Sequence, residues 1–416
     1  MFKPLHLACI LFVIVVLNAS FSFAEETQHE DELIINNTLT LHDLVEKALP
    51  NYPNSTLLAA KKLALEARQI QAKSLLPGSA ALILRNQNDQ LLSRHGETEW
   101  EAGVEFPIWL SGQRKAREAI ANIASQNLSA DAQYLRLQLT GMVRDALWDI
   151  QLMQGLAEIA KAKHEAVSQL QRDIEKRVTL GDMAQKDLLI AQTETLQAES
   201  ERINAEAEVQ HAKFRYKNLT GLNMIPAEFA EIKSAKVDVQ EAHPALMDAN
   251  SKIALSAEQR NLVRIENRDN PTVIIATRSL RGANDTEHNN SLGITLRIPL
   301  QSATRNAPLQ AAAELQYAEN QAHLSQLKLL LAAAMHEAEH NIEVGTAQLG
   351  VLTQQNKIAQ QSLTVTRKAF QLGELDLSDL IRVQTQAFNA ERALKNQQIQ
   401  QLWNTARYNQ AVGELP

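Results

Sequence analysis

Hydrophobic and polar positions alternate strictly in two ten-residue segments of this chain. In the segment 99–108 apolar residues fall at every second position: Trp100, Ala102, Val104, Phe106 and Ile108. In the segment 291–300 the same positions hold Leu292, Ile294, Leu296, Ile298 and Leu300. Period-2 alternation over about ten residues predicts a strand with one apolar and one polar face, as in a membrane strand between lipid and a watery lumen. The segments 79–85 and 272–280 predict two partner strands. An ordinary soluble sheet is the alternative, but the chain offers no second sheet to cover the apolar face.

A helical pattern follows each alternating segment. The tracts 113–225 and 309–415 contain no proline and are rich in Ala, Leu, Gln, Glu and Lys, which favour helix. We predict helical hairpins over 112–219 and 303–411, each with a long helix of about 69 residues, or roughly 100 Å. Ser111 and Ser302 are the expected N-caps. Shorter amphipathic helices are predicted over 41–74, with Thr40 as a capping candidate, and over 244–268.

The whole pattern is written twice, 192 residues apart. Pro107 is followed by Gly181 after 74 residues, and Pro299 is followed by Gly373 after 74 residues. We therefore predict a mainly α chain with two internal repeats of helix–strand–strand–long helix–helix, whose strands contribute to a membrane β-barrel. The repeats are placed at 25–221 and 244–413, with 222–243 as an equatorial linker.

The first 24 residues predict a cleaved secretory signal peptide. Lys3 precedes the apolar run 7–17, and small residues end at Ala24. An uncleaved anchor is the alternative. Cys9 is the only cysteine and lies inside this leader. The mature chain therefore has no thiol for disulfides, thiolate metal sites or nucleophilic catalysis.

Charge and hydropathy exclude some partners and membrane structures. The formal net charge is −7, and removal of Lys3 with the leader makes it −8. No basic tract is present, so we expect no nucleic-acid partner. After residue 24 no apolar stretch approaches the roughly 20 residues of a transmembrane helix. Four strands cannot close a barrel, and open sheet edges are not tolerated in hydrocarbon, so several copies must pool their strands.

The element order, the Pro corners at Phe106-Pro107 and Ile298-Pro299, and the Gly-x5-Asp turns resemble the TolC-type outer-membrane efflux proteins. The overall pattern, including the segment 268–271 (RDNP) before the third strand, is most similar to the heavy-metal (CzcC-type) branch of that family. The resemblance implies a homotrimer in the Gram-negative outer membrane, with a 12-stranded barrel continuous with a long α-helical periplasmic tunnel. It also implies a periplasmic adaptor and an inner-membrane RND-type pump as partners. No cofactor and no enzymatic activity are expected, and the function implied is an exit duct, with heavy-metal cations favoured as cargo.

The resemblance also assigns candidate site residues. Asp379 and Asp187 match entrance aspartates at the periplasmic end, whereas Arg382 stands where a second acidic residue is usual. The adaptor-docking tips would be formed by Leu180, Gly181, Asp182, Leu372, Gly373 and Leu375. The plainer alternative is that the aspartates only cap or solvate the start of their return helices and that the tips are simple turns.

One motif suggests a different function. His336-Glu337-Ala338-Glu339-His340 matches the HExxH pattern of zinc proteases. A catalytic zinc also needs a third ligand and a shaped cleft, and the extended form of the motif fails at Glu343 and Thr346. We therefore exclude the protease and keep only a weak candidate metal patch of His336, His340 and Glu343.

Other functions of the same architecture stay open at this stage. A channel of this build could serve drug efflux or type I protein secretion, since the tube does little chemical selection. A protein of a different class, a soluble periplasmic coiled-coil adaptor, would use the strands as connectors. Adaptors carry a single hairpin set between β-rich domains, whereas this chain has two hairpins and little sheet.

Overall fold

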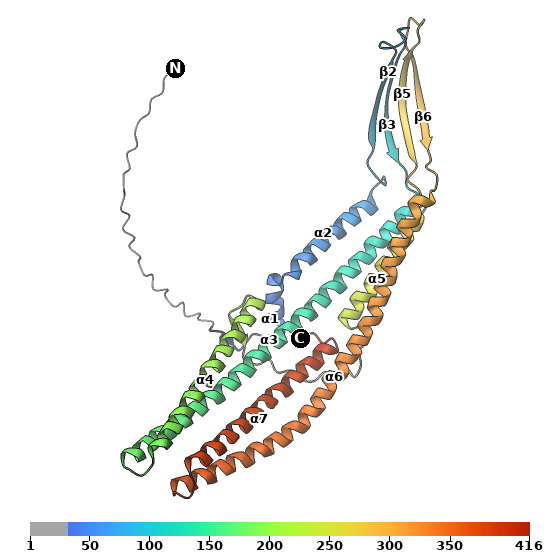
Figure 1. The fold of residues 1–416 in the computed structure, drawn as a ribbon. Coiled ribbons are helices and arrows are strands. Elements are labelled where there is room, and N and C mark those ends of the chain that lie inside the picture. The colour runs from blue at the N-terminus through green and yellow to red at the C-terminus, as the bar shows by residue number, and fades with distance from the viewer. Residues whose placement is uncertain (1–31) are drawn as a thin grey trace, which may run out of the picture.

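The computed structural model describes residues 32–416. The expected signal peptide and Cys9 lie outside this range. The described chain is long and mainly helical (Figure 1): four strands form one end, two helical hairpins form the other, and shorter helices lie between them. The elements are β1 (Ile34–Asn36), α1 (Leu41–Ala48), η1 (Leu49–Asn51), α2 (Asn54–Lys73), β2 (Ala81–Asn88), β3 (Thr98–Pro107), α3 (Gln113–Thr179), α4 (Gln185–Thr220), β4 (Met224–Pro226), α5 (Pro244–Ile265), β5 (Thr272–Arg281), β6 (Asn289–Arg297), α6 (Ala303–Gln371) and α7 (Leu377–Ala411).

The order confirms the predicted internal repeat. Helix α2, strands β2 and β3, and helices α3 and α4 are followed by α5, β5, β6, α6 and α7 in the same sequence. The long helices α3 and α6 have 67 and 69 residues. Strand β6 ends at Arg297, three residues before the predicted end, because Ile298-Pro299 forms the corner into the helix. The proposed repeat and linker boundaries themselves stay a prediction.

The predicted helix over 41–74 is broken into three pieces. Helix α1 begins with a capping box in which Thr40 accepts from the Asp43 backbone N–H at 3.1 Å and Asp43 accepts from that of Thr40 at 3.3 Å. The Thr40 cap is thus present. Pro50 lies in η1, and Pro53 is the N-cap of α2, with extended Tyr52 between them. Proline has no backbone N–H and disfavours helix at the preceding residue, so a continuous helix is interrupted here.

The N-caps of the long helices differ from each other. Ser302 is the N-cap of α6, although its side chain makes no capping hydrogen bond. Ser111 does not cap α3; the N-cap is Gly112, with φ of 79°. Glycine takes this left-handed conformation without strain, which moves the start of α3 one residue past the predicted cap.

The four strands form one antiparallel sheet in the order β2-β3-β5-β6. The central pair, β3 and β5, joins the two repeats, with Gly103 opposite Ala276. Strands β2 and β6 each have one edge without a partner in this sheet. The helices are arranged in the same way: helices of the two repeats pack together in the middle, and the outermost helix on each side has no neighbour beyond it in the described chain.

Gly103 makes the central strand pair possible. A Cβ atom at Gly103 lies 2.6 Å from the Ala276 Cβ and 2.8 Å from the Ile275 carbonyl oxygen, which is too close without backbone movement. We expect Gly103→Ala to destabilise the protein by about 1–3 kcal/mol through overpacking, measured as the shift of thermal unfolding. Gly293→Ala is the matched control, because its Cβ meets nothing closer than 3.9 Å. Equal unfolding temperatures for the two variants would contradict this.

The helices follow the same lateral order as the strands. Next to the sheet the packing order is α2–α3–α5–α6, and in the hairpin half it is α4–α3–α7–α6 (Figure 1). Helices α3 and α6 run through both halves, while α2 and α4 fill one side of α3 and α5 and α7 fill the space between the long helices. Each layer is therefore an open row with two ends.

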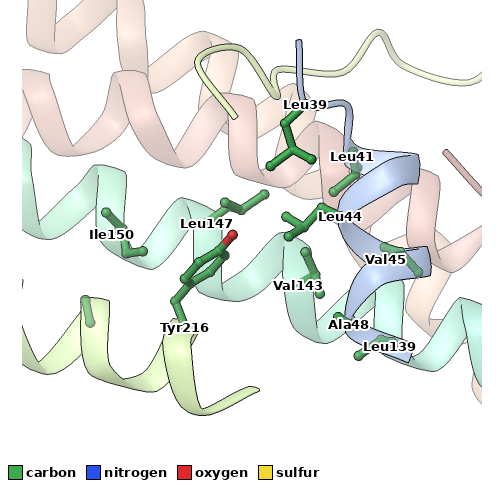
Figure 2. Packing of buried hydrophobic residues seen from close by; sticks show 11 residues of the cluster. Leu39, Leu41, Leu44, Val45, Ala48, Leu139, Val143, Leu147, Ile150 and Tyr216 are labelled. Carbon is green, nitrogen blue, oxygen red and sulfur yellow. The ribbon is translucent and has the colours of Figure 1, made fainter. Parts of the chain in front are cut away.

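A hydrophobic core about midway along the length of the molecule packs α1 against α3 and α4 of the first repeat. Leu44 and Val45 of α1 pack with Leu147 of α3 and Tyr216 of α4 (Figure 2). The Tyr216 hydroxyl donates to the Met224 carbonyl at 2.5 Å. That contact holds β4, which pairs in parallel with β1. The linker region thus carries a short strand tied to the N-terminal segment.

Candidate membrane and tunnel surfaces

One face of the sheet is apolar across all four strands. The strand register places Leu82 beside Val104, Val104 beside Ile275, and Ile275 beside Ile294. Neighbouring rows add Leu84, Ala102 and Leu292, and Phe106, Val273 and Leu296. Ile294 is 73% exposed and Leu82 71% exposed. An uncovered apolar face of this extent marks an interaction surface, because a solvated sheet face is normally polar.

The opposite face has charged residues on all four strands, linked by ion pairs, around a small apolar centre of Ile83, Ile274 and Ala276. Arg278 pairs with Glu99 at 2.7 Å, Arg297 with Glu105 at 3.7 Å, and Arg85 with Glu101 at 4.0 Å. All three glutamates lie on β3 and alternate with its apolar residues. This face suits contact with water. The sheet therefore separates an apolar surface from an aqueous one.

The two hairpin tips have the same backbone structure. Gly181 has φ of 82° and Gly373 has φ of 78°. In the first tip the Asp182 N–H donates to the Arg177 carbonyl at 2.8 Å; in the second the Glu374 N–H donates to the Ala369 carbonyl at 3.0 Å. These are Schellman-type helix ends, in which glycine provides the left-handed residue. The tips expose three leucines, namely Leu180, Leu372 and Leu375.

The two candidate entrance aspartates have different surroundings. Asp379 lies in the first turn of α7, and its backbone N–H donates to the N-cap Asp376. Its carboxylate pairs with Arg382 at 2.9 Å, so part of its charge is compensated within the same helix. Asp187 lies in the first turn of α4 and is half-buried. Neither aspartate is the capping residue of its helix: Asp376 caps α7, and Ala184 stands at the cap of α4.

The HExxH residues do not form a metal centre in the described chain. His336 and His340 lie on the exposed side of α6 with ring planes 11° apart and centroids 6.4 Å apart. Glu343 is exposed on the same helix. Within residues 32–416, no group of three or more His, Cys, Asp or Glu side chains is placed to hold a metal ion.

A buried arginine network at the middle of the chain was missed by sequence reasoning. Arg144 is 3% exposed, and its guanidinium donates to Glu231 at 2.6 and 2.8 Å, to Gln410 at 2.7 Å and to the Glu414 carbonyl at 3.1 Å. It therefore ties α3 to the linker and to the end of α7. Its burial could have been predicted from its helical position, because Arg144 follows Leu137 by seven residues and therefore lies on the same buried stripe of α3.

His243 is a second buried polar group at this level. Its Nδ1 accepts from the Ala245 N–H at 3.1 Å, and Nε2 has no partner among the described residues. Burial, reinforced by Lys236, lowers the pKa of His243 below its usual value. Because the folded state prefers the neutral imidazole, stability from this residue is complete above about pH 6.5 and is lost as the pH falls below it.

We expect the unfolding temperature of the wild-type protein to fall more between pH 7.5 and pH 5.5 than that of His243→Asn. Burial raises the pKa of nearby Asp248, which acts in the opposite direction and is common to both proteins. The measurement is thermal unfolding across this range, with His323→Asn, an exposed position on α6, as control. A wild-type profile that matches His243→Asn would refute the assignment.

None of the helices in residues 32–416 has both the length and the apolar character required to cross a bilayer.

Comparison with solved structures shows the fold. The outer membrane protein VceC from Vibrio cholerae is 16% identical and superposes with a TM-score of 0.73 over 90% of this chain and 96% of its own. The CmeC outer membrane channel of Campylobacter jejuni is 12% identical, with a TM-score of 0.73 over 99% and 94%. CusC, described for its folding and transmembrane channel formation, is 14% identical, with a TM-score of 0.71 over 92% and 94%.

No family model and no curated protein matches the sequence. At these identities the structural likeness defines the fold alone: this chain has the fold of outer-membrane channel proteins. The fold of the single chain expected from the TolC-type resemblance, long helical hairpins with four strands, is thereby confirmed, whereas the trimeric 12-stranded barrel stays a prediction. The neighbours do not single out its heavy-metal branch.

Proposed function

We propose that this protein is the outer-membrane channel of a tripartite efflux system, a duct rather than an enzyme. The proposal rests mainly on the two faces and the two open edges of the four-stranded sheet. Every strand exposes apolar side chains on one face of the sheet, and the opposite face carries ion pairs. The outer edges of β2 and β6 have no partner strand in this sheet. Lipid is the partner that suits the apolar face, and closure into a barrel is the solution for the open edges.

Ring closure between copies satisfies both requirements. The sheet begins with β2 and ends with β6, which are different strands, so copies of the chain can join head-to-tail, with β2 of one copy against β6 of the next. Three copies, the number that the TolC-type resemblance implies, would give a barrel of twelve strands. The helical rows end in the same way, so the same rotation would close a tube below the barrel. The sheet's polar face would then line the lumen.

The hairpin tips lie at the far end of the molecule from the sheet (Figure 1). We assign them to the periplasmic end, where they would dock a periplasmic adaptor and approach an inner-membrane RND-type pump. The exposed leucines Leu180, Leu372 and Leu375 support this, because apolar side chains at a tip need a partner. Gly181, Gly373 and Asp182 would shape the docking turns.

We propose that the cargo is cationic, with heavy-metal cations as the first candidates. The net charge of −7 and the tip-proximal Asp187 and Asp379 support cation attraction at the entrance. Arg382 partly neutralises the negative charge of Asp379 by pairing with it. A ring of such aspartates would also bind multivalent cations that block the pore.

The test is single-channel conductance of the mature protein extracted from outer membranes and reconstituted in planar bilayers. We expect discrete cation-selective conductance steps that multivalent cations block from the tip side. Asp379→Asn should weaken this block several-fold and leave the unblocked conductance intact. Asp285→Asn, in the exposed β5–β6 loop, is the matched control. A protein found in the periplasmic fraction without conductance would overturn the proposal and favour a coiled-coil adaptor.

A further inference from the structure

Helix α4 carries an apolar stripe that its own copy does not cover. Leu189, Leu196 and Ile203 recur every seven residues and are 56%, 66% and 52% exposed. Helix α4 packs on α3 through a different face, which includes the buried Ala191 and Ala198. By helical phase the exposed stripe is directly opposite that packed face. A seven-residue apolar repeat is the pattern that a partner helix recognises.

Helix α6 carries a similar stripe. Val351, Ile358 and Val365 also recur every seven residues and are 67%, 55% and 69% exposed. Helix α6 packs on α7 through another face, which includes the buried Leu363 and Phe370. A groove runs along the α6–α7 pair beside the stripe. Six of its eleven lining residues are apolar or small, namely Gly350, Val351, Ile358, Ala359, Ala390 and Ala393, and the other five are polar, namely Gln354, Gln355, Ser362, Gln386 and Asn389. Small residues in this lining allow a third helix to approach closely.

The two stripes mirror each other about the hairpin tips. Leu189, Leu196 and Ile203 follow Gly181 by 8, 15 and 22 residues. Val365, Ile358 and Val351 precede Gly373 by the same 8, 15 and 22 residues. Helix α4 runs away from its tip and α6 runs towards its tip, so antiparallel packing would bring equal counts to about the same level. Matching heptads on antiparallel helices pack knobs into holes at a shallow angle.

We propose that α4 of one copy lies in the α6–α7 groove of the next copy, with Leu189 beside Val365, Leu196 beside Ile358 and Ile203 beside Val351. This rests on the ring of the proposed function and adds its register. A second copy is the occupant because α4 and α6 are the two ends of the row α4–α3–α7–α6, with their stripes on the outward faces. The seam continues the line of the open strand edges β2 and β6.

The apolar seam is confined to the tip-proximal part of the hairpins. From Leu189 to Ile203 it spans about 21 Å at 1.5 Å per residue. Beyond it the α4 stripe becomes polar at Gln210, whereas the α6 stripe continues for one more heptad with the exposed Val344 and becomes polar at Glu337. Cohesion between copies in the hairpin half would thus be concentrated near the tips.

Cysteine cross-linking tests the register, because Cys9 in the leader is the only cysteine of the sequence. Leu196→Cys with Ile358→Cys should give reducible dimers and trimers on non-reducing gels after mild oxidation of isolated outer membranes. The matched mispair, Leu189→Cys with Val351→Cys, uses the same stripes but separates the thiols by about 21 Å. It should remain monomeric on the gel.

The possible outcomes distinguish a failure of the proposed α4–α6 packing from a failure of the proposed channel function. Cross-linking of the mispair at an equal or higher yield would overturn the register. A ring seen by native mass spectrometry, without cross-linking of the matched pair, would overturn the seam and leave the channel proposal standing. A protein that is monomeric by native mass would overturn both. Each single-cysteine variant controls for contacts between unrelated molecules.

Discussion

Ile294→Arg is expected to abolish the assembled, membrane-inserted protein. Ile294 lies mid-strand in β6, is 73% exposed, and belongs to the apolar row that crosses all four strands. An arginine on the lipid face near the bilayer midplane costs about 2–4 kcal/mol. The cost recurs in every copy of a ring. We expect the variant to be lost from the outer-membrane fraction, measured by immunoblotting of separated membranes.

The adjacent residue provides the control. Thr295 is also exposed in the single chain but lies on the polar face, in the row of Glu105 and Ile274. Thr295→Arg introduces the same side chain one residue away, and we expect it to insert and assemble as the wild type does. Equal losses for the two variants would show that the sheet does not separate lipid from water.

Arg144→Met is expected to produce the largest loss of folding stability. The change leaves the Glu231 carboxylate, the Gln410 amide oxygen and the Glu414 carbonyl without their donor. Removing one partner of a buried ion pair costs about 3–5 kcal/mol; the Glu231 side chain, 17% exposed, would be left mostly buried without its charge partner. The measurement is denaturant unfolding of the extracted protein, followed by circular dichroism.

Arg215→Met is the matched change at the surface. Arg215 pairs with Asp149 at 2.6 Å, but its side chain is 52% exposed. Exposed pairs contribute about 0–1 kcal/mol, so this variant should unfold near the wild-type midpoint. If Arg144→Met did the same, the network at the middle of the chain would not be what holds α3, the linker and α7 together.

The strands and long hairpins could be predicted from sequence because each leaves a strong local signal. Strict alternation set the apolar face of β3 and β6, and proline-free tracts between glycines outlined α3 to α4 and α6 to α7. The equal 74-residue spacing made the repeat visible without any structure. These signals depend on the period of side chains along one element, which the sequence displays directly.

Features that depend on contacts between distant segments could not be predicted. Two misses were local instead: the break of the first helix was readable from Pro50 and Pro53, and the α3 cap shifted from Ser111 to the neighbouring Gly112, whose left-handed backbone ends the turn before the helix. The partners of Arg144 come from segments 87 to 270 residues away. The roles of Asp187, Asp379 and the tip residues stay predictions, since the fold positions them without showing what they bind.

Native mass spectrometry of the protein extracted from isolated outer membranes is the most direct test of ring closure between copies, because four strands with two open edges cannot insert as one copy. We expect a homotrimer in the outer-membrane fraction. A monomer, or a protein recovered only from the soluble periplasmic fraction, would contradict it.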